Sequence, residues 1–461
     1  MAWAIARAAV QSFTIDEAVT YNVFVFNRGY LWYAANNHVL NSTLMYGFIK
    51  VFGLSHFTAR LPALLGTAFY IAASYRLCRL LGASLLVQVT VFVGLVFNPF
   101  IFDYLVAARG YSLALGFLLW SIVFFAESYV NQRSLFVACA VSSACAGMSV
   151  NTNFSFAFVN LATMAVILVS IEYLRPHHTM RLLAAGVLPA AIVLAVVSGY
   201  ALLHTHPGEL IYGASTLRET FGSVIEASLF QSKLEILSPL VFPLVGFTGL
   251  IWLGNAVRRQ AKTPMVFLGL AAGVIFVLTV GLHLAAQTLF GLKLPKDRTA
   301  VYFFPLFMIA AGVLATISPS SRIGRHLRGW FVGALVLMAV YFLSCLRLTY
   351  FKEWRWDSDV QKTYAVLSCL NRENKMTWVA STWPYHAPLN FYLHAQPASM
   401  RIDEKFDSQQ TQIYVVDTVH TAEALDGKDL KMFYRSPLTD LALAASPPLA
   451  DTYSAGTCLR L

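Results

Sequence analysis

Residues 85–102 read LLVQVTVFVGLVFNPFIF, a stretch of eighteen residues without a charged side chain. A helix that crosses the hydrocarbon core of a bilayer needs about 20 predominantly apolar residues, so this stretch is typical of a membrane span. Comparable stretches recur through the first three quarters of the chain. They cover residues 58–81, 85–102, 106–127, 134–150, 154–172, 181–203, 237–255, 265–287, 299–316 and 329–348. The sequence therefore predicts a polytopic α-helical membrane protein.

The overall composition supports this class. Of the 461 residues, 57% are hydrophobic and 12% are charged, whereas a soluble globular chain is roughly one quarter charged. A further apolar run before Ser12 is too short to cross a bilayer. Either this helix is truncated at its start or Met1 is not the true beginning of the protein. Counted as a partial span, this run brings the expected number of spans to about eleven.

The basic residues predict the orientation of the chain. The net charge is +10, but arginine and lysine gather in alternate short loops and form no single basic face, which argues against a nucleic-acid-binding protein. By the positive-inside rule these loops are cytoplasmic. Residues 14–57, residues 204–236 and the tail after Tyr350 then lie outside, in a multi-pass protein of the cell (inner) membrane. Loops as long as the first two are usually functional.

Two domains are expected, a transmembrane domain of residues 1–350 and an extracytoplasmic soluble domain of residues 351–461. In the second domain, helix-like and strand-like segments alternate in the order SDVQKTYAVLSCLN, MTWVAS, YHAPLNFYLHA and QIYVVD. This alternation predicts a small α/β domain. Of the six cysteines, Cys369 and Cys458 alone fall in this domain, and an oxidising compartment would let them form a disulfide.

The segment FTIDEA, residues 13–18, places two adjacent carboxylates just beyond the first apolar run. Thr14 and Glu17 fit the T-x-x-E capping box, in which both side chains bind free backbone amides of the first helical turn. This role explains Glu17, and weakening the cap would cost about 1 kcal/mol. Asp16 is not needed for the cap. It is either an ordinary first-turn aspartate, favoured by the helix dipole, or a functional carboxylate.

Other polar residues are predicted on the same outward surface. Asn37, His38 and Asn41 are spaced to share one face of a helix, which is either a site or a polar face that meets lipid headgroups. Asp103 and Arg109 stand at the outward mouth of two spans, where ionisable groups are costly. These two residues form either a plain ion pair or part of a functional site.

The stretch GLKLPKDRTAVYFFPL, residues 291–306, carries Lys296 and Arg298 on the outward side. The positive-inside rule disfavours such a cluster there, and basic residues at a helix start make a natural anion site. His204, His206 and Glu209 form an H-x-H-x-x-E run without helical spacing or a third histidine. This run supports a divalent metal only weakly, so no metal and no other cofactor is expected.

Taken in order, these motifs resemble the GT-C glycosyltransferases, most closely the branch of the protein O-mannosyltransferases and lipid A aminoarabinose transferases. The resemblance rests on the short first span followed by D-E, the N-H-x-x-N helix leading into FGLSHFTARLP, the ARGYSLAL helix start, and the late D-R-x-x-x-Y-x-x-P. It is strongest over residues 13–115. The sequence departs from the family in VAARGY, where relatives often carry glutamate before the arginine, and in NHVLN, where many have a His-Pro-Pro run.

The resemblance implies an enzyme that moves a sugar from a polyprenyl-phosphate donor to a lipid, glycan or protein acceptor at the extracytoplasmic face. Asp16 matches the family's catalytic aspartate, and a carboxylate is what an acceptor hydroxyl or phosphate needs to be activated. Arg298, Lys296 and Arg109 are expected to stabilise the departing lipid phosphate. The residues expected to bind substrate are Glu17, Asn37, His38, Asn41, Asp103, Arg109, Tyr111, Lys296, Arg298 and Tyr302. The departures leave the second acidic residue and the acceptor open.

A transporter or flippase of a lipid-linked sugar is the alternative function, because an apolar groove with charges at its edge would also suit translocation. Transporters place their charges near the bilayer midplane and contain inverted repeats. Here the charges are expected at the outward rim and the sequence shows no repeat, which favours the enzyme. A third possibility is a membrane-anchored scaffold whose tail binds a partner, although the tail shows no obvious site.

Overall fold

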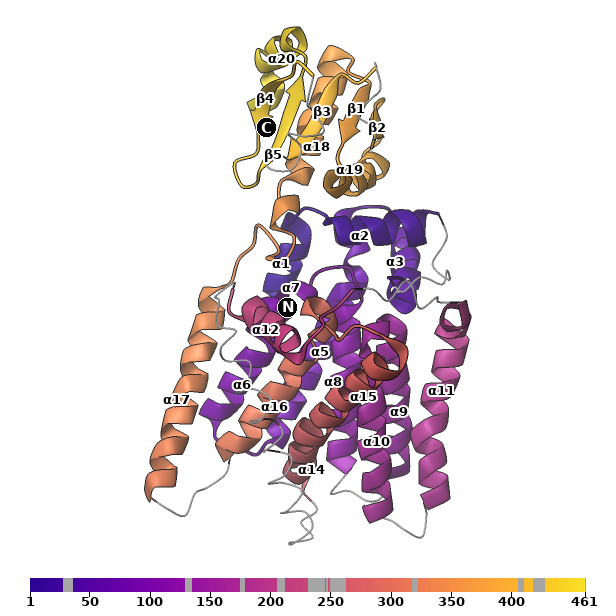
Figure 1. Cartoon of the computed structure of the whole chain (residues 1–461), viewed down its shortest axis with the longest axis vertical. Coiled ribbons are helices and arrows are strands. Elements are labelled where there is room, and N and C mark those ends of the chain that lie inside the picture. The colour runs from indigo at the N-terminus through magenta and orange to yellow at the C-terminus, as the bar shows by residue number, and fades with distance from the viewer. Residues whose placement is uncertain are drawn as a thin grey trace.

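The computed structural model describes residues 1–27, 36–128, 135–174, 179–204, 212–230, 245, 248, 263–316, 322–404, 410–417 and 428–460. Figure 1 shows a bundle of long helices at one end of the molecule and a small sheet with its own helices at the other. Short helices lie between these two parts, at the end of the bundle nearest the C-terminal sheet. We call this middle region the junction layer. It contains α1 (Ala2–Val10), α2 (Ile15–Val19), α3 (Val39–Phe52), α4 (His56–Ala59), α7 (Pro99–Tyr104), α12 (Leu217–Ser228) and the turn η8 (Asp297–Ala300).

The bundle is built from apolar helices. Among the described residues, seven helical segments are long and apolar enough to cross a membrane. They lie in α5 (Leu61–Leu80), α8 (Tyr111–Ser128), α9 (Leu135–Thr152), η3 (Phe154–Phe156) with α10 (Ala157–Leu174), α11 (Thr179–His204), the run from α14 (Pro264–Leu270) through η7 (Ala271–Ile275) to α15 (Phe276–Phe290), and α17 (Arg322–Ser344). The described residues also contain three shorter apolar helices, α6 (Leu85–Phe97) and α16 (Phe303–Thr316) in the bundle and α3 (Val39–Phe52) in the junction layer. Apart from Val245 and Thr248, the predicted span at 237–255 lies outside the described residues, so the number eleven stays a prediction.

The predicted span at 85–102 is not one helix. Helix α6 ends at Phe97 because the residue before a proline is pushed out of the helical conformation, and Asn98 accordingly has an extended ψ of 127°. The Asn98 side chain then accepts hydrogen bonds from the amides of Phe100 and Ile101, which starts the separate helix α7 (Pro99–Tyr104). The turn after α7 occupies the residues before Tyr111, so the next span starts five residues later than predicted.

Small residues set the close contacts inside the bundle. A Cβ atom on Gly66 of α5 would meet the backbone nitrogen of Leu113 in α8 at 2.5 Å, so only glycine allows these two helices to approach this closely. Helix α8 lies at the centre of the bundle, with α5 and α9 beside it, and most of its residues are buried. Most of the apolar residues of α11 and α17 remain exposed in the isolated chain, as expected for helices that face lipid.

The junction layer is formed largely by the first fifth of the chain. Its first two helices are α1 (Ala2–Val10) and α2 (Ile15–Val19), which continues into the π-helical turn η1 (Thr20–Phe26). Helix α3 (Val39–Phe52) and the short helix α4 (His56–Ala59) follow, and α12 (Leu217–Ser228) and the 3-10 turn η8 (Asp297–Ala300) join them from the later part of the bundle. The layer therefore gathers segments that are far apart in the sequence.

The C-terminal domain has a five-stranded sheet in the order β2-β1-β3-β5-β4. Its strands are β1 (Trp378–Ser381), β2 (Arg401–Asp403), β3 (Ile413–Asp417), β4 (Lys431–Arg435) and β5 (Leu441–Ala445). Strand β1 pairs in parallel with β2 and β3, while β5 pairs antiparallel with β3 and β4. Its helices are α18 (Val360–Asn374), α19 (Trp383–Ala395) and α20 (Pro447–Ser454), followed by the 3-10 turn η11 (Thr457–Arg460). The two strands predicted from MTWVAS and QIYVVD are β1 and β3, and the other three were not predicted.

The C-terminal domain packs directly on the segment that carries Asp16. The rings of Phe13 and Phe391 stack with their centroids 3.9 Å apart, and the backbone amide of Phe13 donates a hydrogen bond of 2.8 Å to the Tyr392 hydroxyl. Both aromatic residues belong to α19, and they share one hydrophobic cluster with Phe13. Helix α19 of the C-terminal domain thus packs against the residues that precede α2. Helix α2 therefore lies between the helix bundle and the C-terminal domain.

Candidate active site

Helix α2 begins with the predicted capping box. The Thr14 hydroxyl accepts a hydrogen bond from the amide of Glu17 at 3.3 Å, and the Glu17 carboxylate accepts one from the amide of Thr14 at 2.9 Å. The C-terminal part of the chain adds a third acceptor, because Asp357 Oδ2 receives the amide of Ile15 at 2.8 Å. The start of α2 is therefore held by its own side chains and by a residue that follows the last helix of the bundle.

Glu17 points into the protein and belongs to its framework. Its carboxylate receives two guanidinium bonds from Arg60, at 2.6 and 2.8 Å, and the amide of Ala108 at 2.7 Å, and the side chains of both ionic partners are fully buried. Both carboxylate oxygens are thus occupied before any substrate arrives. This geometry corrects the expectation that Glu17 also binds substrate, and we assign it to structure alone.

Asp16 points the other way, because consecutive residues on a helix lie about 100° apart. Its Oδ2 atom is 2.5 Å from Nη1 of Arg298, and the same nitrogen lies 3.0 Å from Oε1 of Glu353. These three side chains come from α2, η8 and the segment after α17, and each remains 18% to 29% exposed. One guanidinium therefore contacts both carboxyl groups at a site that solvent reaches.

The two carboxylates at this site are not equivalent. Burial, together with the negative charges of Asp16 and Asp103, raises the pKa of Glu353 to about 8. Glu353 therefore keeps its proton through most of the neutral range even though it lies beside Arg298. Glu353 was missed in the sequence, where the only signal is the charged pair Lys352–Glu353 directly after the last span on the outward side.

Arg109 reaches the same helix from the turn before α8. Its Nη1 donates to Thr20 Oγ1 at 2.7 Å and to the backbone oxygen of Asp16 at 3.3 Å, and its Nη2 donates to Asn36. The turn requires Gly110, which has a φ of +75° and whose Cβ, if present, would lie 2.5 Å from a backbone oxygen. The structure thus places Arg109, one of the predicted site residues, in contact with Asp16.

His38 and Asn41 border this region at the start of α3. The His38 ring is buried, lies 5.7 Å from the Tyr111 ring, and has no hydrogen-bond partner for either nitrogen within the described ranges. Burial and the positive charges of Arg109 and Arg298 hold the pKa of His38 well below its usual range, so the imidazole is neutral. Asn41 donates to the backbone oxygen of Ala108 at 3.2 Å. Asn37, at the same end of α3, accepts a hydrogen bond from the hydroxyl of Ser42 at 2.9 Å.

Asp103 does not pair with Arg109. It binds Arg7 at 2.7 Å and Arg347 at 2.5 Å, and it also accepts the amide of Lys352 at 2.7 Å. These contacts replace the ion pair between Asp103 and Arg109 that their spacing suggested, because the turn between them directs the arginine toward α2 instead. Asp103 thereby ties α1, α7 and the segment after α17 together beside the site.

Of the remaining predicted residues, Lys296 lies at the start of the turn that carries Arg298, whereas Tyr302 is buried in the bundle. Lys296 precedes the η8 turn that carries Arg298 and lines a cavity beside it. Tyr302 is fully buried in the bundle, where its hydroxyl is 2.7 Å from Nε2 of His283. We therefore place Tyr302 in the support of the bundle. The neighbouring Asp297 accepts a hydrogen bond of 2.9 Å from the hydroxyl of Tyr212.

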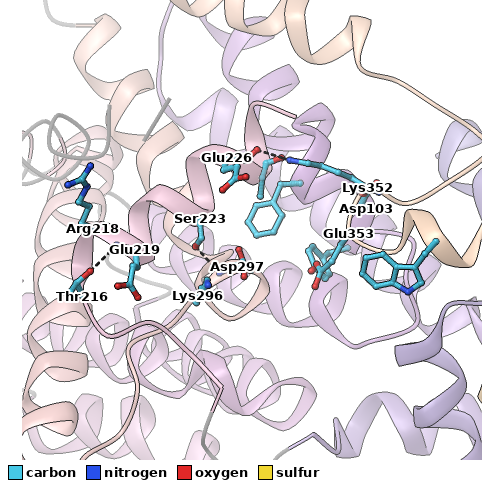
Figure 2. Close-up of a pocket in the computed structure, with 14 residues that line it drawn as sticks. Asp103, Thr216, Arg218, Glu219, Ser223, Glu226, Lys296, Asp297, Lys352 and Glu353 are labelled. Carbon is cyan, nitrogen blue, oxygen red and sulfur yellow. Dashed lines mark hydrogen bonds between the residues drawn. The ribbon is translucent and has the colours of Figure 1, made fainter. Parts of the chain in front are cut away.

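A cavity of about 670 Å³ adjoins the Asp16–Arg298–Glu353 group. Figure 2 shows side chains of α12, such as Ser223 and Glu226, on one part of its wall, with Glu353 and Asp103 on another. The lining residues are Phe100, Asp103, Tyr104, Thr216, Arg218, Glu219, Ser223, Glu226, Ala227, Lys296, Asp297, Lys352, Glu353 and Trp356. Glu353 belongs both to the cavity wall and to the Asp16–Arg298–Glu353 group, so a molecule in the cavity lies next to the site.

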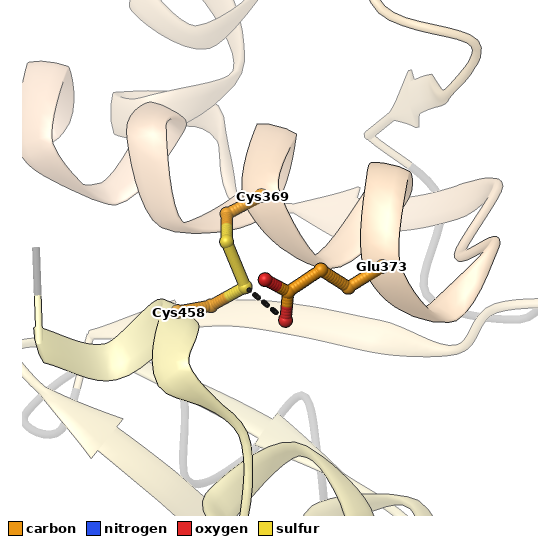
Figure 3. Close-up of side chains that lie close together, drawn as sticks. All are labelled: Cys369, Glu373 and Cys458. Atoms are coloured by element: carbon orange, nitrogen blue, oxygen red, sulfur yellow. Dashed lines mark hydrogen bonds between the residues drawn. A yellow bond between two sulfur atoms is a disulfide. The ribbon is translucent and has the colours of Figure 1, made fainter.

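Metal-ligand residues gather at one place in the part of the chain that the structure describes, where Cys369, Glu373 and Cys458 lie together (Figure 3). Cys369 and Cys458 are joined by a disulfide, as the sequence suggested, and a disulfide leaves no thiolate to bind a metal. Of the weak H-x-H-x-x-E candidate, His204 bonds the backbone oxygen of Tyr200, while His206 and Glu209 lie outside the described residues.

No protein-family model and no curated protein matches the sequence. Solved structures do match the fold. The crystal structure of ArnT from Cupriavidus metallidurans in the apo state has a TM-score of 0.55 and 14% sequence identity, covering 96% of this chain and 96% of that chain. The structure of the same protein bound to undecaprenyl phosphate has a TM-score of 0.50 and 14% identity, covering 97% and 96%.

The chain thus has the fold of ArnT, and the part that the structure describes contains seven helical segments long and apolar enough to cross a membrane. The match extends over nearly the whole length of both chains, so it includes the C-terminal domain as well as the helix bundle. The resemblance predicted from the motifs is confirmed at the level of the fold. The site residues were identified from the contacts described above and not from this comparison.

Proposed function

We propose that this protein is a membrane glycosyltransferase that moves a sugar from a polyprenyl-phosphate donor to an acceptor at the extracytoplasmic face. The observation that carries the proposal is the partly exposed Asp16 carboxylate, held by Arg298 at the end of an apolar helix bundle. A carboxylate in such a position is suited to take a proton from an acceptor, and the bundle provides the apolar surface that a polyprenyl chain needs.

The reaction assigns the groups as follows. The acceptor oxygen forms a bond to the anomeric carbon of the sugar, and its proton passes to the Asp16 carboxylate. The bond between that carbon and the phosphate oxygen breaks, and its electron pair leaves with the lipid phosphate. Arg298 and Arg109, which both contact Asp16, stabilise the charge that grows on the phosphate. Arg298 must then turn from Asp16 toward the donor, so the ion pair describes the enzyme before substrate binds.

Lys296 and the neutral His38 complete the donor side of the site. Lys296 adds a cation beside Arg298, and the uncharged imidazole is available as a hydrogen-bond partner for a sugar hydroxyl. One of the two ArnT structures compared above contains bound undecaprenyl phosphate. This supports a polyprenyl phosphate as the lipid part of the donor. The sugar that we propose is a hexose or a pentose.

The test uses full-length protein in nanodiscs, with membranes from cells that lack the protein as the source of donor and acceptor. Asp16→Asn should reduce sugar transfer by about a thousandfold, since the amide keeps the shape but cannot take a proton. Binding of undecaprenyl phosphate should persist in the variant. An Asp16→Asn protein that transfers sugar at the wild-type rate would overturn the proposal. The charges around Asp16 would then be better explained by transport of a lipid-linked sugar.

A further inference from the structure

Glu353 and Asp16 share one arginine. Nη1 of Arg298 lies 2.5 Å from Oδ2 of Asp16 and 3.0 Å from Oε1 of Glu353. If both carboxyl groups were ionised, one guanidinium would face two negative charges, which favours a proton on one of the two groups. That group is Glu353, because burial and the charges of Asp16 and Asp103 raise its pKa to about 8. At neutral pH the group therefore consists of one arginine, one carboxylate and one neutral acid.

The fold holds Glu353 in this position from both sides. The amide of the preceding residue, Lys352, donates a hydrogen bond of 2.7 Å to Oδ2 of Asp103 in α7. The following residue, Trp354, is 2% exposed, and its ring centroid lies 5.6 Å from that of Tyr104, which also belongs to α7. Because both neighbours are anchored to α7, the Glu353 backbone has little freedom to move. The position of its carboxyl group beside Arg298 is thus set by packing and not by the ionic contact alone.

Several elements contribute charged and titratable groups around Glu353. They are Asp16 of α2, Asp103 and Tyr104 of α7, Glu226 of α12, Lys296, Asp297 and Arg298 at the η8 turn, and Lys352 beside it in sequence. Figure 2 shows the other charged residues of α12, Arg218 and Glu219, on the far part of the cavity wall. The Lys352 ammonium is engaged elsewhere, because it donates to the backbone oxygens of Glu226 and Ala227 at 2.6 and 3.1 Å. In the described part of the chain, Arg298 is thus the cation that contacts the Glu353 carboxyl group.

A neutral acid and an ionised carboxylate act differently on Arg298. The carbonyl oxygen of a protonated carboxyl group accepts a hydrogen bond from the guanidinium, but an ionised group forms a bond that is roughly twice as strong. The proposed transfer requires Arg298 to turn from Asp16 toward the lipid phosphate. A neutral Glu353 allows this turn, because it orients the arginine without binding it strongly. An ionised Glu353 would compete with the phosphate for the arginine and would also repel the phosphate.

We propose that Glu353 is a positioning residue that keeps the Arg298 guanidinium free to bind the donor phosphate, and that it does so only while its carboxyl group is protonated. The proposal rests on the function proposed above and adds a proton-dependent step to donor binding. While Glu353 is protonated, the donor meets an arginine that has one ionised partner, Asp16. Once Glu353 is ionised, donor binding requires the uptake of a proton, so the affinity for the donor decreases as the pH rises.

The test measures binding of radiolabelled undecaprenyl phosphate, which carries the lipid and the phosphate of the proposed donor, to full-length protein in detergent micelles. From about one pH unit below the pKa of Glu353 to about one unit above it, the wild-type dissociation constant should rise roughly tenfold. The phosphate itself contributes little, because its second pKa is about 6. In Glu353→Gln, whose amide cannot ionise, the dissociation constant should stay nearly constant. The number of binding sites is fitted separately, so that unfolding at high pH is not mistaken for weaker binding.

Lys352→Gln is the matched control, because Lys352 is a neighbour that titrates in the same range. Burial lowers the pKa of its ammonium group to about 8, and loss of that charge would also weaken the binding of a phosphate. The hydrogen bond from Lys352 to Asp103 comes from the backbone and therefore remains in the variant. If Glu353 is the source of the pH dependence, the affinity of Lys352→Gln for undecaprenyl phosphate should still decrease as the pH rises.

Two outcomes would overturn the role of Glu353. One is a Glu353→Gln protein whose affinity decreases with pH as steeply as that of the wild type, and the other is a wild-type affinity that does not change with pH. If Glu353→Gln fails to fold, Glu353→Met, which is similar in length and also uncharged, is judged by the same measurement. Wild-type protein that binds no undecaprenyl phosphate at any pH would refute the proposed function itself, so the two failures remain distinct.

Discussion

Arg60 and Glu17 form an ion pair of 2.6 Å in which neither side chain is exposed. The guanidinium also donates to the backbone oxygens of Gln11 and Ser12, so it connects the end of α1 to the start of α2. The pair therefore fixes the direction of the helix that carries Asp16. Asp16 and Glu17 are neighbours in sequence, but one side chain is held inside the protein and the other faces the site.

Glu17→Gln should lower the free energy of unfolding by about 3–5 kcal/mol, because it leaves the buried guanidinium of Arg60 without a counter-ion. This loss is larger than the loss of about 1 kcal/mol expected for the helix cap alone. Chemical unfolding in detergent micelles measures it. Arg76→Gln is the control, since it breaks an exposed pair with Glu127 and should cost less than about 1 kcal/mol. Equal effects of the two substitutions would contradict the role assigned to Glu17.

Tyr392→Phe should loosen the helix that carries Asp16. The substitution removes the acceptor for the buried amide of Phe13 and should cost about 1–3 kcal/mol. Hydrogen exchange at the Phe13 amide should become faster, and sugar transfer should fall with it. In the control Tyr364→Phe, the lost bond runs to Gln396 inside the C-terminal domain, so transfer should be unaffected. Slow exchange at Phe13 in Tyr392→Phe would show that the C-terminal domain does not support α2.

Cys458→Ser should destabilise the C-terminal domain by about 2–4 kcal/mol, because the disulfide closes a loop with a sequence separation of 89 residues. The bond joins α18 to the η11 turn at the end of the chain. Mass mapping of the untreated protein under non-reducing conditions should recover the two cysteines in one linked peptide pair. Two free thiols in protein isolated from the cell envelope would rule out the bond.

The stability of the protein should depend on the protonation of Glu353. Its pKa is about 8 in the folded protein and about 4.3 in an unfolded chain, so the folded state binds the proton more tightly. The resulting stabilisation is complete below the unfolded value and is lost as the pH rises through the folded value. The variant Glu353→Gln mimics the protonated acid. Compared with this variant, the wild type should show a melting temperature that decreases as the pH rises from the lower to the higher of these two pKa values. A constant difference between the two proteins across this range would contradict the raised pKa.

Cysteine labelling tests the orientation predicted from the basic loops. Single cysteines at Asn27 and Thr452, both exposed, should react with an impermeant reagent added to whole cells. A cysteine at the exposed Arg325 should react only after the membrane is opened. Cys345 is replaced by serine in every variant, because the other three free cysteines are buried. Labelling of Asn27→Cys without labelling of Thr452→Cys would refute the shared side.

Local patterns in the sequence predicted the elements that depend on neighbouring residues. The T-x-x-E spacing was sufficient for the cap at Thr14 and Glu17, since both partners lie within one helical turn. The apolar runs predicted most of the long helices for the same reason. Asn98 and Pro99 show the limit of counting hydropathy, because a continuous apolar run hid a helix boundary that only the dihedral restriction before proline reveals.

Contacts between distant segments could not be predicted in this way. Arg298 is separated from Asp16 by 282 positions and from Glu353 by 55, so no spacing rule connects the three. Asp103 and Arg109 looked paired because they are close in sequence, whereas the fold supplies Arg7 and Arg347 to Asp103. Which charge meets which depends on how the junction layer assembles, and that information lies in the packing of the whole chain.

The support of Phe13 by Tyr392 has a consequence for how the protein is made. Ribosomes add about 5–20 residues per second, and 379 positions separate these two residues, so roughly 20–75 seconds pass between their synthesis. During that time the Asp16 segment exists without its partner. A chain whose translation stops early is therefore expected to insert into the membrane but remain inactive, so only completed molecules would carry out the proposed transfer.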